Sequence, residues 1–315
     1  MSRRVLCSLY AAGWLLACGR HPTIDRQRAA ALFTEVVVET SPGLSGLAAD
    51  DLGGYWTVAE RGAEVYRVTL GERQVAAVQR FSVRGVPAGT DLEGIAVLDL
   101  GGPVGADGLP RRFALGTEGQ LAGKATVLLA ERAADVLTVT GTIALPEAVV
   151  GIELRGNQGA EGVCGAGDTI FAAIEGAGEG TGEHAGKRWA PVVRIVGGKP
   201  ERTYKVWLTS EVGKLSGLDC RVAADGTATV LAIERHFEVT KVLRFSLGAE
   251  ADVTPQVALD LGPVLRAGLN LEGIAWSAAG PNAGQVVAAV DNQWRTITGP
   301  SEFLLFAPGA LAAPQ

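Results

Sequence analysis

The sequence predicts an all-β protein, and within that class a β-propeller with five blades of four antiparallel strands. Three observations lead to this prediction: a high glycine content, a sequence unit that recurs five times, and room for four short strands in each unit. Glycine supplies 43 of the 315 residues, about twice its usual share of roughly 7%. Because proline contributes only 14 residues and no collagen-like period is present, this composition favours many tight turns between short strands.

The recurring unit opens with a serine or a glutamate, continues with glycine and then has an aliphatic residue. Its five copies lie at 44–48, 92–96, 160–164, 215–219 and 271–275. Each copy is followed by a turn-like stretch and a strand-like run that ends in a carboxylate. These end residues are Glu60, Glu118, Glu175, Glu234 and Asp291. Such self-similarity is the signature of a repeat architecture, and four strands per unit in a radial array make a propeller.

The last unit has only one further strand-like run, at 302–307, whereas the earlier units have two. The missing strand is available at 32–39, so we expect the N-terminal strand to complete the fifth blade. This closure would remove two open sheet edges that invite aggregation. A six-bladed ring is an alternative, because the step from Glu93 to Glu161 is long enough to hold extra strands, and a pair of β-sandwich domains is another. The predicted domain covers 32–308, followed by a tail at 309–315.

The first eighteen residues are predicted to be a signal peptide. Arginines at 3 and 4 precede an apolar run at 5–17, which is shorter than the roughly 20 residues of a membrane-spanning helix and typical of a secretory signal. The run ends in Leu-Leu-Ala-Cys-Gly, which resembles a bacterial lipobox and implies a lipid on the sulfur of Cys18. The alternative is an ordinary signal in which Cys18 is incidental. Residues 19–31 are predicted to be a polar tether between this anchor and the folded domain. The lipid would keep the protein at the bacterial cell envelope, at the outer membrane or in the periplasm.

Charge content bears on the class of binding partner, and cysteine content bears on disulfide bonds and zinc sites. The chain has 34 acidic and 28 basic residues with no basic tract, which argues against nucleic acid as a main partner. Only Cys164 and Cys220 belong to the predicted folded part, and an oxidising compartment would permit them to pair. The sequence leaves that pairing open. No cysteine and histidine spacing typical of a zinc site is present.

Corresponding positions of propeller blades face the same end of the central channel, so the repeated acidic residues should converge there. One ring precedes the repeated glycines and consists of Ser45, Glu93, Glu161, Ser216 and Glu272. A second ring consists of the carboxylates that end the second strands, and Asp91 and Asn270 lie beside both rings. So many like charges repel one another unless cations or hydrogen bonds offset them.

Two interpretations of these rings are open. In the first, Ca²⁺ is bound by carboxylate oxygens, and two arginines that follow ring carboxylates, Arg61 and Arg235, hold an anionic substrate. The expected metal ligands are Glu60, Asp91, Glu93, Glu234, Glu272 and Asp291. In the second interpretation, the carboxylates at the strand ends accept backbone N–H groups and only fix the packing of the blades.

The candidate catalytic residues are Glu93, Glu161, Glu272 and His236. His236 lies near the predicted channel mouth, where it can act as an acid or base or be an exposed structural histidine. Machinery for a nucleophilic serine is weak, because the chain has no G-x-S-x-G motif. Ser45 or Ser216 paired with His236 is therefore an alternative without a supporting motif.

Several of these motifs together resemble the phytase-like family known as "esterase-like activity of phytase". The matching segments include Ala59-Glu60-Arg61-Gly62, Asp91-Leu92-Glu93-Gly94-Ile95-Ala96 and Asn270-Leu271-Glu272-Gly273-Ile274-Ala275. The resemblance runs in order from about residue 43 to 306. It implies a secreted, often lipid-anchored propeller whose repeated acidic residues suggest hydrolysis of phosphate or other esters. Gly159 departs from the pattern, since Asp91 and Asn270 occupy its position in other units.

The sequence thus leads to one main functional hypothesis and one alternative. The main hypothesis is a lipid-anchored, calcium-dependent hydrolase of phosphate or other esters, acting on a small anionic substrate. The alternative is a propeller that binds a ligand or an envelope protein without catalysis, because residues repeated in every blade are more typical of structure than of asymmetric chemistry.

Overall fold

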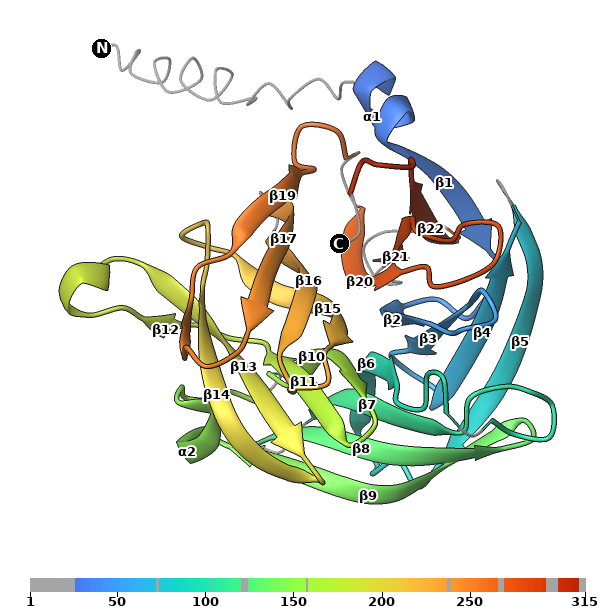
Figure 1. The fold of residues 1–315 in the computed structure, drawn as a ribbon, viewed down its shortest axis with the longest axis horizontal. Helices are drawn as coiled ribbons and strands as arrows, with labels where there is room; N and C mark the ends of the chain where they lie inside the picture. The colour runs from blue at the N-terminus through green and yellow to red at the C-terminus, as the bar shows by residue number, and fades with distance from the viewer. Residues whose placement is uncertain are drawn as a thin grey trace, which may run out of the picture.

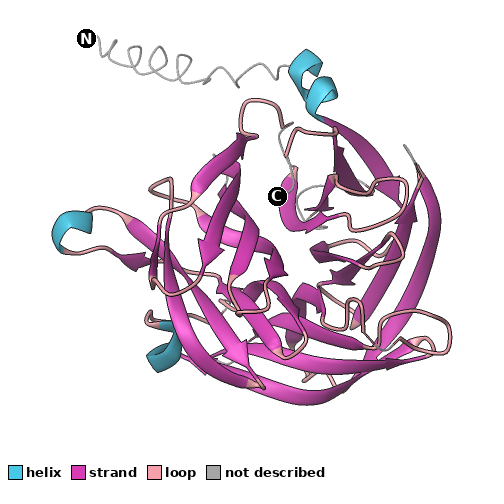
Figure 2. Ribbon diagram, in the orientation of Figure 1, coloured by secondary structure: helices cyan, strands magenta, loops and turns pink. Residues whose placement is uncertain are grey.

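The computed structural model describes residues 26–71, 74–102, 104–119, 124–156, 158–236, 239–265, 269–292 and 300–311. Across these residues the chain is all-β and propeller-like, with its sheets standing around a central axis (Figure 1). Helix is confined to short segments at the rim (Figure 2), namely α1 (Arg26–Leu32), α2 (Glu147–Val150) and η1 (Gly182–His184). The predicted fold class, all-β, is confirmed.

The N-terminal predictions lie mostly outside the described part. The signal segment, Cys18 and the first residues of the tether fall before Arg26, whereas α1 occupies the end of the expected tether. Within the described ranges, no helix has both the length and the apolar character needed to cross a bilayer.

The first two repeats share one sheet of eight strands. Each repeat forms an antiparallel four-stranded half, and the halves join through a short parallel pairing of residues 82–84 in β5 with residues 136–138 in β9. The first half contains β2 (Leu44–Ala49), β3 (Gly54–Ala59), β4 (Glu64–Leu70) and β5 (Val75–Arg84). The second contains β6 (Thr90–Val97), β7 (Arg112–Gly119), β8 (Lys124–Ala133) and β9 (Val136–Pro146).

The third and fourth repeats form separate sheets. The third contains β10 (Ala160–Ala166), β11 (Thr169–Ile174), β13 (Arg188–Val196) and β14 (Lys199–Trp207). The short β18 (Asp252–Val253) is added at its edge beside β14, and β12 (Gly178–Glu179) pairs with β13. The fourth contains β15 (Lys214–Val222), β16 (Ala228–His236), β17 (Val239–Leu247) and β19 (Gln256–Asp260). The glycine-rich segment at 176–186 contains β12 and η1, which project from the rim (Figure 1).

The remaining sheet joins the two ends of the described chain. It contains β20 (Asn270–Trp276), β21 (Val286–Asp291), β22 (Ser301–Phe306) and the N-terminal strand β1 (Phe33–Val38). β1 pairs with β22 in antiparallel register from Phe33–Phe306 to Val38–Ser301. The predicted pairing of the N-terminal strand with the last repeat is therefore confirmed.

The strands nearest the axis are β2, β6, β10, β15 and β20, and each contacts the next until β20 returns to β2. Glycine makes this approach possible. A Cβ atom on Gly46 would lie 2.8 Å from the Cα atom of Gly94, and one on Gly273 would lie 2.5 Å from the carbonyl carbon of Gly46. Real Cβ contacts are not this short, so a larger residue here would push neighbouring backbones apart. The apolar core lies between the sheets, where side chains such as Trp56 and Phe171 are fully buried.

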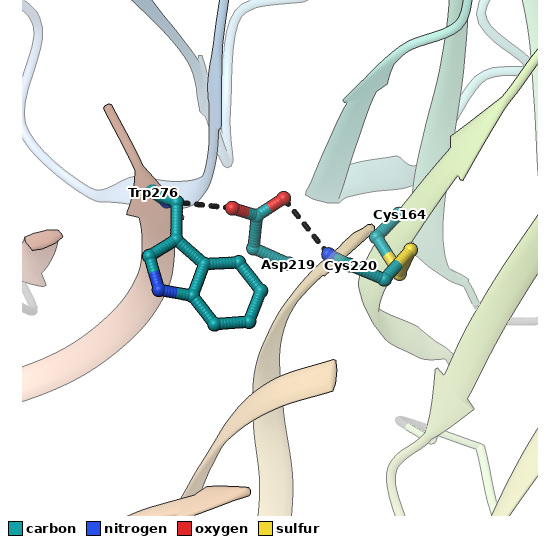
Figure 3. The surroundings of a disulfide bond; sticks show 4 residues. All are labelled: Cys164, Asp219, Cys220 and Trp276. Carbon is teal, nitrogen blue, oxygen red and sulfur yellow. Dashed lines mark hydrogen bonds between the residues drawn. A yellow bond between two sulfur atoms is a disulfide. The ribbon is translucent and has the colours of Figure 1, made fainter. Parts of the chain in front are cut away.

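A disulfide links two neighbouring inner strands. Cys164 in β10 is bonded to Cys220 in β15, with Cα atoms 5.6 Å apart (Figure 3). Beside it, the buried carboxylate of Asp219 accepts the backbone N–H groups of Cys220 at 2.9 Å and of Trp276 at 2.6 Å. Burial nonetheless raises the pKa of Asp219 to about 6. The pairing that the sequence left open thus fastens the third sheet to the fourth.

Substituting Gly273 with alanine should destabilise the ring, because the new methyl group would meet backbone atoms of the first repeat. Overpacking of this kind costs about 1–3 kcal/mol or more, which urea unfolding would measure. Gly156→Ala is the matched control, since no atom lies within 4 Å of that Cβ position. Equal unfolding midpoints for the two variants would contradict the packing argument.

Removing the disulfide should lower the free energy of unfolding. The two cysteines are 56 residues apart, and a closed loop of that length corresponds to about 4 kcal/mol in the chain-entropy model. We expect the Cys164→Ala/Cys220→Ala variant to unfold at lower urea than the oxidised wild type. A reducing agent should bring the wild type to the level of the variant and leave the variant unchanged. An effect of reductant on both proteins would point to another cause.

Candidate functional site

The inner strands present their acidic residues through β-bulges. The pairing of each inner strand with the second strand of its repeat shifts register at the same repeated position. The residues left out of the ladder include Glu93 in β6, Glu161 in β10 and Glu272 in β20. A bulge turns a side chain away from its regular direction. All three glutamates are buried at the same end of the inner strands.

The two serines that replace glutamate in this ring have a different role. Ser45 Oγ donates to the carbonyl oxygen of Glu93 at 2.7 Å, and Ser216 Oγ donates to that of Leu271 at 3.1 Å. Each hydroxyl therefore fastens its strand to the next inner strand. This arrangement suits packing better than a nucleophilic serine.

Glu272 is held in a tight polar network. Arg235 on β16 donates through Nε to Glu272 Oε2 at 2.9 Å and forms a second ion pair with Oε1, while its terminal nitrogen lies 4.0 Å from Glu161 Oε2. Asn270 Nδ2 donates to Glu272 Oε1 at 2.8 Å and to Asp291 Oδ2 at 3.0 Å. Burial would lower the pKa of Arg235, but Glu272 and Glu161 outweigh it and raise that pKa.

The carboxylate of Glu161 also belongs to a group of three carboxylates. Oxygen atoms of Glu118, Glu161 and Glu175 all lie within 4.8 Å of one another. Glu118 comes from β7 and Glu175 directly follows β11, so neighbouring repeats contribute to one cluster. Glu175 also forms an ion pair with Lys214 Nζ. Burial, followed by the charge of Glu161, raises the pKa of Glu118 to about 7.

Glu93 lies next to this cluster and is the least compensated of the acidic residues. The residue is 6% exposed, and its carboxylate has no hydrogen-bond or ion-pair partner among the described residues. Burial, together with the charges of Glu161 and Glu60, raises its pKa well above the usual value. Burial, followed by Asp291 and Glu272, likewise raises the pKa of Glu60 to about 8. Burial also raises the pKa of Glu272 to about 7, although Arg235 opposes it.

In contrast to Glu93, the carboxylate of Glu234 accepts hydrogen bonds at both oxygens. Its carboxylate accepts Thr209 N at 3.0 Å, Thr209 Oγ1 at 2.6 Å and Ser210 Oγ at 2.6 Å. This is the structural arrangement expected for a carboxylate that fixes packing between units. His236 follows two residues later on β16, so strand alternation places it on the face of Glu234 and not on that of Arg235.

The two remaining predicted residues lie at the edge of the acidic group. Arg61 is exposed in the turn after β3, where its charge lowers the pKa of Glu60. Asp91 is half-buried on β6 opposite Glu118, and its charge contributes to the raised pKa of Glu60 and of Glu118. The structure thus brings Glu60, Asp91, Glu93, Glu161, Glu272, Asp291 and Arg235 to one end of the inner strands.

Sequence reasoning missed Lys214 as a site residue and placed Glu118 and Glu175 only in the outer ring. The signal for Lys214 was present, because it lies two residues before Ser216, as Asp91 does before Glu93 and Asn270 before Glu272. Aligning the five units at this position would have revealed Lys214 beside two polar residues, Asp91 and Asn270, and two glycines, Gly43 and Gly159.

Comparison with known proteins gives a family and distant structural likenesses. A family model described as "Esterase-like activity of phytase" matches residues 40–293, and no match was found among curated proteins. Similar solved structures include an aldose sugar dehydrogenase from Streptomyces coelicolor with PQQ bound (14% identity, TM-score 0.44, 88% of this chain and 98% of that chain). An endo-arabinase from Bacteroides thetaiotaomicron is also similar (8% identity, TM-score 0.47, 88% and 96% covered). At these values the likenesses support no conclusion about activity.

The raised carboxyl pKa values predict a specific pH dependence of stability. Glu60, Glu118 and Glu272 hold protons in the folded state up to about pH 8, 7 and 7, whereas their ordinary value is 4.5. Their stabilising contribution is therefore complete below pH 4.5 and is lost as the pH rises through 7 and 8. In EDTA, the melting temperature should fall between pH 5.5 and 9. Glu60→Gln/Glu118→Gln should flatten this slope, and a higher melting temperature at pH 9 would contradict the assignment.

Proposed function

We propose that this chain, which belongs to the phytase-like family, is a metal-dependent hydrolase of phosphate esters. One observation carries the proposal: three carboxylates converge within 4.8 Å at one end of the inner strands, and the carboxylate of the buried Glu93 beside them has no hydrogen-bond or ion-pair partner among the described residues. Bringing so much negative charge out of water is unfavourable unless a cation offsets it.

The donor set fits a hard cation such as Ca²⁺. Calcium takes carboxylate oxygens at about 2.3–2.6 Å, so two oxygens on one ion can be at most about 5.2 Å apart. The oxygens of Glu118, Glu161 and Glu175 satisfy that limit. These three residues would hold the ion, and Glu93 lies next to them. When bound, the ion would lower the pKa of a bound water and offset negative charge in the transition state.

The other residues of the site have separate tasks in this proposal. Arg235, fixed by Glu272 on two sides, would direct its remaining N–H groups toward phosphate oxygens, and Arg61 would add positive charge from the rim. With a cation offsetting the neighbouring charges, an ionised Glu93 would accept a proton from the attacking water as the water oxygen bonds to phosphorus and the phosphorus–oxygen bond to the leaving group breaks. Glu60, with a pKa of about 8, is protonated at neutral pH and can supply a proton to the leaving oxygen.

We also propose that the fold is a five-bladed propeller. Counting the eight-stranded sheet as two blades joined by the β5–β9 pairing gives one blade for each sequence repeat. The cyclic contacts of β2, β6, β10, β15 and β20 support this count. A six-bladed ring would need a further inner strand between β6 and β10, which are in direct contact.

The proposed place of action is the bacterial cell envelope. The basic residues at 3 and 4, the apolar run at 5–17 and the lipobox-like ending support export and a lipid anchor on Cys18. The Cys164–Cys220 disulfide is consistent with an oxidising compartment. Mass spectrometry of the protein recovered from membranes would test the anchor.

Turnover by the purified protein tests the proposed activity. We expect calcium-dependent release from p-nitrophenyl phosphate or bis-p-nitrophenyl phosphate and loss of release in EDTA. Glu93→Gln/Glu272→Gln should lower kcat by about 100-fold or more, while the circular dichroism stays unchanged. Glu131→Gln is the control, because Glu131 is exposed and pairs with Arg112, at the end of β7 opposite to Glu118.

Other outcomes would identify the alternatives. Cleavage of p-nitrophenyl butyrate that EDTA does not affect would direct attention to Ser45, Ser216 and His236. Calcium binding without turnover of any of the three substrates would favour a binding propeller without catalysis. Unchanged kcat in the double glutamine variant would overturn the catalytic assignment of Glu93 and Glu272.

A further inference from the structure

Lys214 is a basic residue beside the three clustered carboxylates of Glu118, Glu161 and Glu175. It begins β15 at the repeat position that Asp91 and Asn270 hold in other units. Its ammonium group forms an ion pair with Glu175, one of the three clustered carboxylates. The side chain is 26% exposed, so it is partly open to solvent. Lys214 therefore places a positive charge at the group of oxygens that is best arranged to bind a metal ion.

The ion pair compensates only part of the negative charge in this region. Lys214 contacts Glu175 and Arg235 contacts Glu272 and Glu161, but neither cation has a contact with the side chain of Glu93 in the described chain. A lysine carries one charge on a flexible stem, whereas a divalent ion carries two charges and accepts several oxygens at once. Glu175 cannot give the same oxygen fully to both.

We propose that Lys214 is the internal counter-ion of the metal site, and that a divalent cation displaces its ammonium group from Glu175. This inference rests on the proposed function, since it concerns the metal of that same site. Displacement needs no bond to form or break within the chain, only rotation of the lysine side chain. The lysine thereby holds the metal-free site together and lowers its affinity for the metal.

The ammonium group of Lys214, once displaced from Glu175, would lie beside the guanidinium group of Arg235. Lys214 and Arg235 are direct cross-strand partners of β15 and β16, so the two cationic side chains start from neighbouring positions. Two adjacent cations at the acidic end can hold a phosphate oxyanion together. Metal loading would therefore release a second phosphate-binding group, and the bound metal should increase the affinity for phosphate.

Calcium titration of the full-length protein tests this inference. In Lys214→Met, which removes the competing charge, the calcium affinity at pH 7 should rise about tenfold or more, equivalent to about 1.4 kcal/mol. The matched control is Lys241→Met, because Lys241 donates to Thr209 Oγ1 at 2.9 Å and belongs to the Glu234 network instead. Isothermal titration calorimetry gives the affinity without any assay of turnover.

A second variant connects the effect to Glu175. Glu175→Gln should weaken calcium binding, and adding Lys214→Met to it should then have little further effect, because the ion pair is already lost. If Lys214→Met does not fold, Lys214→Gln serves the same purpose, with circular dichroism as the check. Calcium affinity in Lys214→Met that equals or falls below that of the wild type would overturn the inference, as would the absence of calcium binding in every variant.

Inorganic phosphate provides the other readout. Calcium should increase phosphate affinity in the wild type, and this increase should shrink in Lys214→Met. The two proposals fail separately: a lysine effect on calcium binding without any ester hydrolysis overturns only the proposed function. Calcium-dependent hydrolysis with no lysine effect on calcium affinity overturns only the displacement.

Discussion

The close approach of the five inner strands is the constraint on which the rest of the structure depends. Their repeated glycines touch in sequence around the axis, from Gly46 to Gly94 and back from Gly273 to Gly46. A side chain at these positions would push the backbones apart, and the sheets could then not surround a common axis. The serine hydroxyls and the disulfide reinforce the same contacts between neighbouring strands.

The same closeness creates the electrostatic problem at the acidic end. Because the glycines bring the strands together, the glutamates immediately before them have no room to separate, and their bulges keep them buried. Arg235 and Lys214 compensate part of the charge, while burial and the neighbouring carboxylates raise the pKa of Glu60 and of Glu93. A site in this condition is suited to take up protons or a cation.

The sequence repeats predicted the fold class, the pairing of the N-terminal strand with the last repeat and the convergence of Glu93, Glu161 and Glu272. They could do so because each unit supplies the same residue at the same position of an inner strand. The contacts between units could not be predicted in this way. The grouping of Glu118 with Glu175, the saturation of Glu234 by Thr209 and Ser210, and the disulfide all depend on how neighbouring sheets are placed, which no spacing within one unit reports.

The departures from the repeat are what make the acidic end asymmetric. A ring of five identical glutamates would repel equally in all directions and would favour no single position for a cation or a substrate. Ser45 and Ser216 remove two of those charges, and Lys214 and Arg235 add positive charge in the fourth repeat. Negative charge is therefore least compensated at Glu93, in the second repeat, whereas both cations come from the fourth repeat, where Lys214 pairs with Glu175 and Arg235 with Glu272. In the function proposed above, this asymmetry would favour one position for the metal ion and another for the anion.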